Sequence, residues 1–123
     1  MKPPSFEILK LIGKGNFGKV IQVRKKDTNR IYAMKVLNKQ YLIDNHEVKH
    51  ALIQAKARPF LMELEFSFQT YSHLYFVTDF MNGGDLRWHL LNETRFSEER
   101  AKFYVAEIVL ALEYLHKCNI VYR

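Results

Sequence analysis

The chain has 123 residues, of which 48% are hydrophobic and 26% are charged, so it can form one folded domain at most and is unlike a disordered protein. Its single cysteine excludes an internal disulfide. No apolar run approaches the roughly 18 residues that cross a membrane, and no signal-peptide pattern opens the chain. Together these features predict an intracellular protein, cytoplasmic or nucleocytoplasmic, without a transmembrane segment. The formal net charge of +6 comes without a basic stripe interleaved with aromatic residues, so we do not expect nucleic-acid binding.

The first two thirds of the chain predict an antiparallel sheet. Short connections join the first three strands, which favours antiparallel pairing. Residues 44–57 have a helical composition and stop before Pro59, which cannot continue a helix. The segments expected to be strands are rich in β-branched and aromatic residues and cover about 6–13, 18–26, 30–37, 63–68 and 74–79.

The last third of the chain predicts two helices. Asp85 can cap a short helix over about 86–91. Ser97 can cap a long helix that continues to about Lys117, with acidic residues in its first turn. Apolar residues lie on nearly every face of the long helix, and such a helix is normally buried on all sides. This chain has little to bury it with, so we expect marginal stability or aggregation.

A glycine-rich segment, "GKGNFG", covers residues 13–18. In a dinucleotide-binding fold such a segment opens a helix, but here "KVIQVRKK" follows, which favours a strand. The alternatives are a plain hairpin loop, or a flexible hairpin that closes over nucleotide phosphates. The segment alone favours the plain loop.

Three residues on the neighbouring strands favour the phosphate-binding alternative. Val20 follows the last glycine, and Ala33 and Lys35 lie in "YAMK" on the next strand. Val20 and Ala33 would form an apolar roof for a flat base, and Lys35 would reach the phosphates.

Six segments of the chain, which follow one another over nearly its whole length, resemble known sequences. Together they resemble the catalytic domain of eukaryotic protein kinases, in the order in which that family has them. Within them it is similar to the AGC group, near protein kinase B, the serum- and glucocorticoid-regulated kinases and their fungal relatives. The segments are "FEILKLIGKGNFGKV", "IYAMKVL", "RPFLMELEFSFQT", "LYFVTDFMNGGDL", "RFSEERAKFYVAEIVLALEYLH" and "NIVYR".

The resemblance implies an α+β fold. Residues from about 6 to 81 would form a protein-kinase-like N-lobe and hinge, with a five-stranded antiparallel sheet and a shortened helix C. Residues from about 82 to 123 would begin a helical C-lobe with its first two helices, D and E. Residues 1–123 would thus be a partial protein kinase domain, truncated before the catalytic aspartate.

The resemblance also implies ATP as the ligand, with Mg in an intact enzyme, and a protein substrate for the full-length enzyme. The glycines would cover the phosphates, Lys35 would pair with the α- and β-phosphates, and Val20 and Ala33 would sandwich adenine with Leu86 below. The residues so implied are Ile12, Gly13, Lys14, Gly15, Asn16, Phe17, Gly18, Val20, Ala33, Lys35, Thr78, Asp79, Met81, Asp85 and Leu86. No metal ligand is expected among the 123 residues.

Two of these residues keep a structural alternative. Thr78 falls at the gatekeeper position, and the hinge from Asp79 to Met81 follows it, with a backbone that would meet the adenine edge. A buried strand threonine is also an adequate explanation of Thr78. Asp85 falls where the family places an acid that meets the ribose, and it is equally explained as a helix cap.

Two departures from the family concern catalysis. Tyr122 and Arg123 match the start of the family's "YRD", so the catalytic base would follow Arg123, and we expect residues 1–123 alone to be inactive. The helix after Glu47 is several residues shorter than in the family, and the missing stretch holds the glutamate that orients Lys35; we do not assign that role to Glu47. The alternative is a non-catalytic kinase-like binding or decoy protein, or the product of a damaged or mis-called gene.

Overall fold

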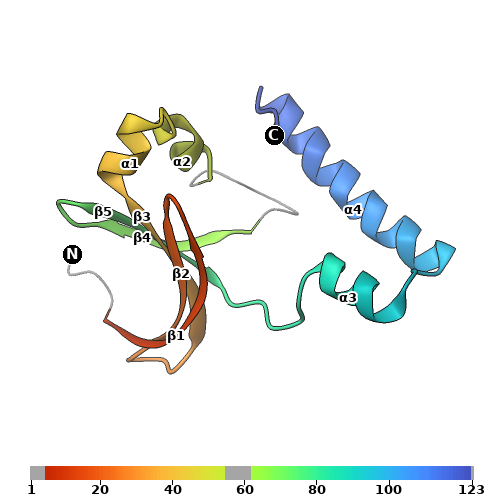
Figure 1. The fold of residues 1–123 in the computed structure, drawn as a ribbon, viewed down its shortest axis with the longest axis horizontal. Helices are drawn as coiled ribbons and strands as arrows, with labels where there is room; N and C mark the ends of the chain where they lie inside the picture. The colour runs from red at the N-terminus through yellow and green to blue at the C-terminus, as the bar shows by residue number, and fades with distance from the viewer. Residues whose placement is uncertain (1–4, 55–61, 123) are drawn as a thin grey trace. The chain divides into compact units, whose positions relative to one another are not determined.

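The computed structural model describes residues 5–54 and 62–122 (Figure 1). Among these, residues 5–54 and 62–80 form one compact unit, and residues 81–122 form a second. The first unit contains the sheet and two short helices, and the second contains two further helices (Figure 1).

The first unit is built on a five-stranded antiparallel sheet with the order β1-β2-β3-β5-β4. The five strands and the α+β class that the sequence predicts are confirmed, with bounds that differ by one or two residues. The strands are β1 (Phe6–Gly15), β2 (Gly18–Lys25), β3 (Ile31–Asn38), β4 (Leu64–Gln69) and β5 (His73–Asp79).

One face of the sheet carries a closed hydrophobic core. Phe6, at the start of β1, packs against this core, with its ring centroid 6.0 Å from that of Phe66 and 6.3 Å from that of Tyr32. The two most deeply buried side chains, Val23 and Val77, are 0% exposed. The buried members of the core are Ile21, Val23, Tyr32, Met34, Val36 and Val77. Phe6 and other aromatic side chains cover this face, so we look for a site on the opposite face of the sheet.

The opposite face packs against two short helices, α1 (Lys39–Asp44) and α2 (Val48–Gln54) (Figure 1). A second cluster of buried residues joins the sheet to them: Leu37, Leu42, Ala51 and Phe76. This cluster positions α1 and α2 beside β3, the strand that contains Lys35.

The predicted helix over 44–57 is wrong at its start. Asn38 ends β3 and caps α1, because its side chain accepts a hydrogen bond from the backbone N–H of Tyr41 at 3.0 Å. The chain then breaks at Asn45 and at His46, which has a φ of 57°. A positive φ cannot continue a helix, so a second helix begins at Val48 instead. Residues 55–57 of the prediction lie outside the described residues.

The second unit contains α3 (Leu86–Glu93) and α4 (Glu98–Lys117). Both predicted caps are confirmed: Asp85 accepts from the N–H of Trp88 at 2.7 Å, and Ser97 accepts from the N–H of Arg100 at 3.2 Å. Arg100 also forms an ion pair with Glu93 at the end of α3. This ion pair joins the end of the short helix to the first turn of the long one.

The surface of α4 exposes apolar side chains along much of the helix. Leu115 is buried, but five other apolar side chains of α4 are 44–62% exposed. This agrees with the expectation that the chain has little to bury the helix with. None of the helices in the described part of the chain has the length and apolar character needed to cross a membrane. The exposed side chains are Phe103, Val105, Ile108, Val109 and Leu110.

Candidate nucleotide-binding site

The glycine-rich segment is the tip of the hairpin between β1 and β2. Gly15 pairs with Gly18, which leaves Asn16 and Phe17 at the tip. A Cβ atom on Gly18 would lie 1.9 Å from the carbonyl oxygen of Val36, so only glycine allows this close approach to β3. The N–H of Asn38 donates to the carbonyl oxygen of Phe17 at 3.1 Å. The tip is therefore held against the end of β3.

Four of the predicted site residues lie on one face of the sheet. Val20 of β2 pairs directly with Lys35 of β3, and Ala33 pairs directly with Thr78 of β5. Directly paired residues of antiparallel strands point to the same face, and so do residues two apart on one strand. Val20, Ala33, Lys35 and Thr78 therefore share a face, and Gly13 pairs with Val20 at its edge.

Lys35 is half-buried, and its burial lowers the pKa of its amino group below the ordinary 10.5. The ring of Phe17 lies beside it, with the Lys35 Nζ atom 4.7 Å from the ring centroid. A positive charge near the face of an aromatic ring is attracted to it, so Phe17 stabilises the ammonium form. The hairpin tip therefore partly covers the ammonium group of Lys35, which we expect to bind phosphates.

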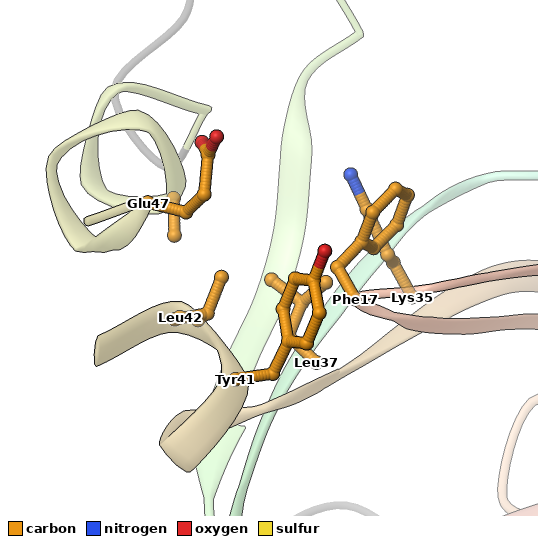
Figure 2. A pocket seen from close by; sticks show the side chains of 7 residues that line it. Phe17, Lys35, Leu37, Tyr41, Leu42 and Glu47 are labelled. Carbon is orange, nitrogen blue, oxygen red and sulfur yellow. The ribbon is translucent and has the colours of Figure 1, made fainter. Parts of the chain in front are cut away.

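Lys35 lines a pocket of about 240 Å³ between the hairpin tip, β3 and the two short helices (Figure 2). Its described lining is mostly apolar, with Lys35, Glu47 and Tyr41 as the titratable side chains. The lining residues are Phe17, Lys35, Leu37, Tyr41, Leu42, Glu47 and Ala51. A pocket with apolar walls and a few convergent polar groups is the usual form of a small-molecule site.

Glu47 is a charged residue of this pocket that the sequence analysis did not count among the site residues. It immediately precedes α2: its N–H donates to the carbonyl oxygen of Leu42 at 2.8 Å, and its carbonyl oxygen accepts from the N–H of Ala51 at 3.1 Å. Its side chain lines the pocket on the side of the two short helices, whereas Lys35 lines it from β3 (Figure 2). The positive φ of His46 ends the run from α1 just before Glu47, and the sequence analysis, which expected one helix over 44–57, gave no signal for this break.

A second hollow, of about 270 Å³, lies around the hairpin tip. It brings together five predicted residues of the glycine-rich segment, Lys14, Gly15, Asn16, Phe17 and Gly18, with Lys19, Val36, Asn38 and His73. Ile12, on β1, is 48% exposed and lines neither hollow among the described residues.

Asp79 directs its side chain away from the face that carries Lys35. It pairs in register with Tyr32, whose side chain belongs to the closed core, and its carboxylate forms an ion pair with Arg30 at 2.7 Å. This carboxylate raises the pKa of Arg30. Thr78 is half-buried, and its hydroxyl lies 3.5 Å from the carbonyl oxygen of Asp79. The hinge role predicted for Asp79 involves its backbone, whereas the ion pair with Arg30 involves its carboxylate.

The remaining predicted residues, Met81, Asp85 and Leu86, belong to the unit formed by residues 81–122. Met81 is 69% exposed and Leu86 is 40% exposed. The capping interpretation of Asp85 is confirmed by its hydrogen bond from Trp88. Its role at a ribose stays a prediction.

Comparisons with known proteins place this geometry in a family. Residues 6–123 match the model of the protein kinase domain. Serine/threonine-protein kinase SCH9 from Saccharomyces cerevisiae is 56% identical over 129 residues, which cover 98% of this chain and 16% of that protein. A RAC family serine/threonine-protein kinase homolog from Dictyostelium discoideum is 53% identical over 96% of this chain and 28% of its own length. For RAC-beta serine/threonine-protein kinase from Rattus norvegicus the values are 52%, 96% and 26%.

Two facts about length follow from these comparisons. The chain spans less than a third of each of these relatives. The match to SCH9 covers 129 residues although this chain has only 123, so that relative contains residues inside the matched region that this chain lacks. This agrees with a shortened segment within the domain.

Proposed function

The chain belongs to the protein kinase domain family, and we propose that it is the ATP-binding portion of an AGC-type serine/threonine protein kinase. The observation that carries the proposal is the shared face of Val20, Ala33, Lys35 and Thr78 next to a glycine hairpin. The whole protein would transfer the γ-phosphoryl group of ATP to a serine or threonine of a protein substrate.

The face offers different chemistry to the two ends of ATP. Val20 and Ala33 present small apolar side chains to the flat base, with Thr78 beside them, and the backbone from Asp79 to Met81 would meet its polar edge. Lys35 presents a cation to the phosphates, close to the backbone of the hairpin tip. Mg²⁺, which kinases bind together with ATP, would neutralise further phosphate charge.

Phe17 has to move for the phosphates to reach Lys35. The centroid of its ring lies 4.7 Å from the Lys35 Nζ atom. A phosphate offers the ammonium a full opposite charge in place of the weaker attraction of a ring. We therefore expect ATP to displace the ring and to leave the close approach of Gly18 to β3 unchanged.

We infer that residues 1–123, tested by themselves, bind ATP without transferring its phosphoryl group. In the family, transfer uses an aspartate that accepts the hydroxyl proton, together with an asparagine and a second aspartate that hold Mg²⁺. The motifs that supply these three residues do not occur in residues 1–123. Phosphotransfer by the purified chain that is lost in Lys35→Met would overturn this inference.

The test of the proposed function is binding of a fluorescent ATP analogue in the presence of Mg²⁺. We expect saturable binding that unlabelled ATP displaces, and a loss of about tenfold or more in affinity for Lys35→Met, because a charge-assisted contact is removed. Lys26→Met is the matched control: it removes the same charge from an exposed position next to the end of β2. Equal affinities for the two variants would contradict the proposal.

A further inference from the structure

The turn before α3 contains two adjacent glycines, Gly83 and Gly84, and Gly84 has a φ of 80°. Glycine adopts more backbone conformations than any other residue, so such a turn keeps one conformation only if contacts from elsewhere fix it. Asp85 follows directly, and the family resemblance implies that its carboxylate meets the ribose of the nucleotide. The conformation of the two glycines therefore decides where this carboxylate lies.

The first turn of α3 supplies contacts on both sides of Gly84. On one side, the Nε2 atom of His89 lies 2.6 Å from the carbonyl oxygen of Gly83. On the other side, Asp85 accepts two hydrogen bonds: its Oδ1 atom accepts from the N–H of Trp88 at 2.7 Å, and its carbonyl oxygen accepts from the N–H of His89 at 3.2 Å. Both neighbours of Gly84 are therefore tied to α3, and the tie to Gly83 is the side chain of His89.

Two neighbours in the same unit orient the imidazole ring of His89. The ring of Trp88 lies edge-on to it with a centroid distance of 4.8 Å, and Glu93 Oε1 lies 4.0 Å from its Nδ1 atom. Glu93 is itself joined to Arg100 of α4 by an ion pair. Because the carbonyl oxygen of Gly83 can only accept a hydrogen bond, the Nε2 atom of His89 carries the hydrogen of this bond.

Capping of α3 leaves part of the Asp85 carboxylate for a ligand. The cap uses Oδ1, and a carboxylate accepts further hydrogen bonds at its second oxygen. A group that is held in place before binding gives a higher affinity than a mobile one, because less conformational freedom is lost. We propose that His89 is a positioning residue for the nucleotide: its hydrogen bond to Gly83 fixes the turn that presents Asp85 to the ribose hydroxyls. This rests on the proposed function, and His89 would act through Asp85 rather than by contacting ATP.

The test compares ATP with dideoxy-ATP, which lacks both ribose hydroxyls, by calorimetric titration of residues 1–123 in the presence of Mg²⁺. We expect ATP to bind about tenfold more tightly, because dideoxy-ATP cannot donate a hydrogen bond to the charged carboxylate. His89→Leu should reduce this preference to about threefold or less and leave the affinity for dideoxy-ATP nearly unchanged. His89→Gln, whose amide can still donate to the carbonyl oxygen of Gly83, should retain most of the preference.

His116→Leu is the matched control, since it removes an imidazole from an exposed position of α4 in the same unit and should leave the preference for ATP unchanged. Equal losses of affinity for both nucleotides in His89→Leu would indicate a purely structural role and overturn the inference, as would an unchanged preference. If the unsubstituted chain binds both nucleotides equally, the inference fails while the proposed function stands. If it binds neither, the proposed function fails as well.

A measurement without any substitution covers the case in which His89→Leu does not fold. Nitrogen NMR correlations of the imidazole ring distinguish its two neutral tautomers in mildly alkaline solution. We expect the Nε2–H tautomer for His89, because this atom donates to the carbonyl oxygen of Gly83. The Nδ1–H tautomer would contradict this hydrogen bond and overturn the inference.

Discussion

Phe17, at the hairpin tip between β1 and β2, is in contact with Lys35 of β3, with the ammonium 4.7 Å from the ring centroid. The contact is possible because Gly18 lets the hairpin tip approach Val36. The residue that covers the lysine is thus part of the glycine-rich segment itself, so the proposed nucleotide binding would depend on the position of the hairpin tip.

Replacing Phe17 by alanine should tighten ATP binding by a few fold. The ring has to leave Lys35 before phosphates can reach it, and breaking a cation–π contact costs about 0.5–2 kcal/mol. Competition with a fluorescent ATP analogue measures the effect. A loss of affinity of tenfold or more would show instead that the ring contacts the nucleotide directly.

ATP affinity should decrease as the pH rises through the pKa of Lys35. Burial lowers this pKa below 10.5, so the decrease should occur at a lower pH than an ordinary lysine would give. Phosphate attracts the ammonium form, and deprotonation removes that attraction. Binding measured from neutral to alkaline pH tests this, and Lys35→Met should show weak binding without the same transition. A transition that persists in this variant would assign it to another group.

Gly18→Ala should destabilise the first unit by about 1–3 kcal/mol, because a Cβ atom would collide with the carbonyl oxygen of Val36 at 1.9 Å. Gly13→Ala is the matched control from the same segment, since a Cβ atom there would meet no atom within 4 Å. Urea denaturation of both variants measures the difference in the free energy of unfolding. Similar losses for the two would contradict the close approach.

Val77→Ala should reduce the free energy of unfolding by about 2 kcal/mol, because it opens a cavity in the closed core. Val77 is 0% exposed, whereas Val121 is 73% exposed. Val121→Ala should therefore change the stability by less than about 0.5 kcal/mol. The same urea titration compares them, and a larger loss for Val121 would show that this residue is buried against something else.

Much of the fold could be predicted because its signals are local. The strands are separated by turn residues such as Asn29, which adopts a φ of 58° between β2 and β3. Asp85 and Ser97 were identifiable as caps because each is a short polar residue just before a helical segment. These signals need no knowledge of the rest of the molecule.

The parts that could not be predicted depend on tertiary contacts. The helix α1 has only six residues, and its start depends on Asn38, which also ends a strand. The place of Glu47 depends on the break at His46 and on the packing of Leu42 and Ala51 against Leu37. No sequence pattern indicates that the ring of Phe17 covers Lys35. Sequence reasoning therefore proposed residues for the candidate site but could not predict which side chains lie next to them.

The measurement that tests the central claim most directly is an NMR titration of residues 1–123 with Mg-ATP. The account predicts saturable chemical-shift changes at Val20, Ala33, Lys35 and Thr78, and small changes at Val23 and Val77 in the closed core of the opposite face. Saturable changes confined to the core face, or none at millimolar ATP, would contradict a nucleotide site on the face that carries Lys35.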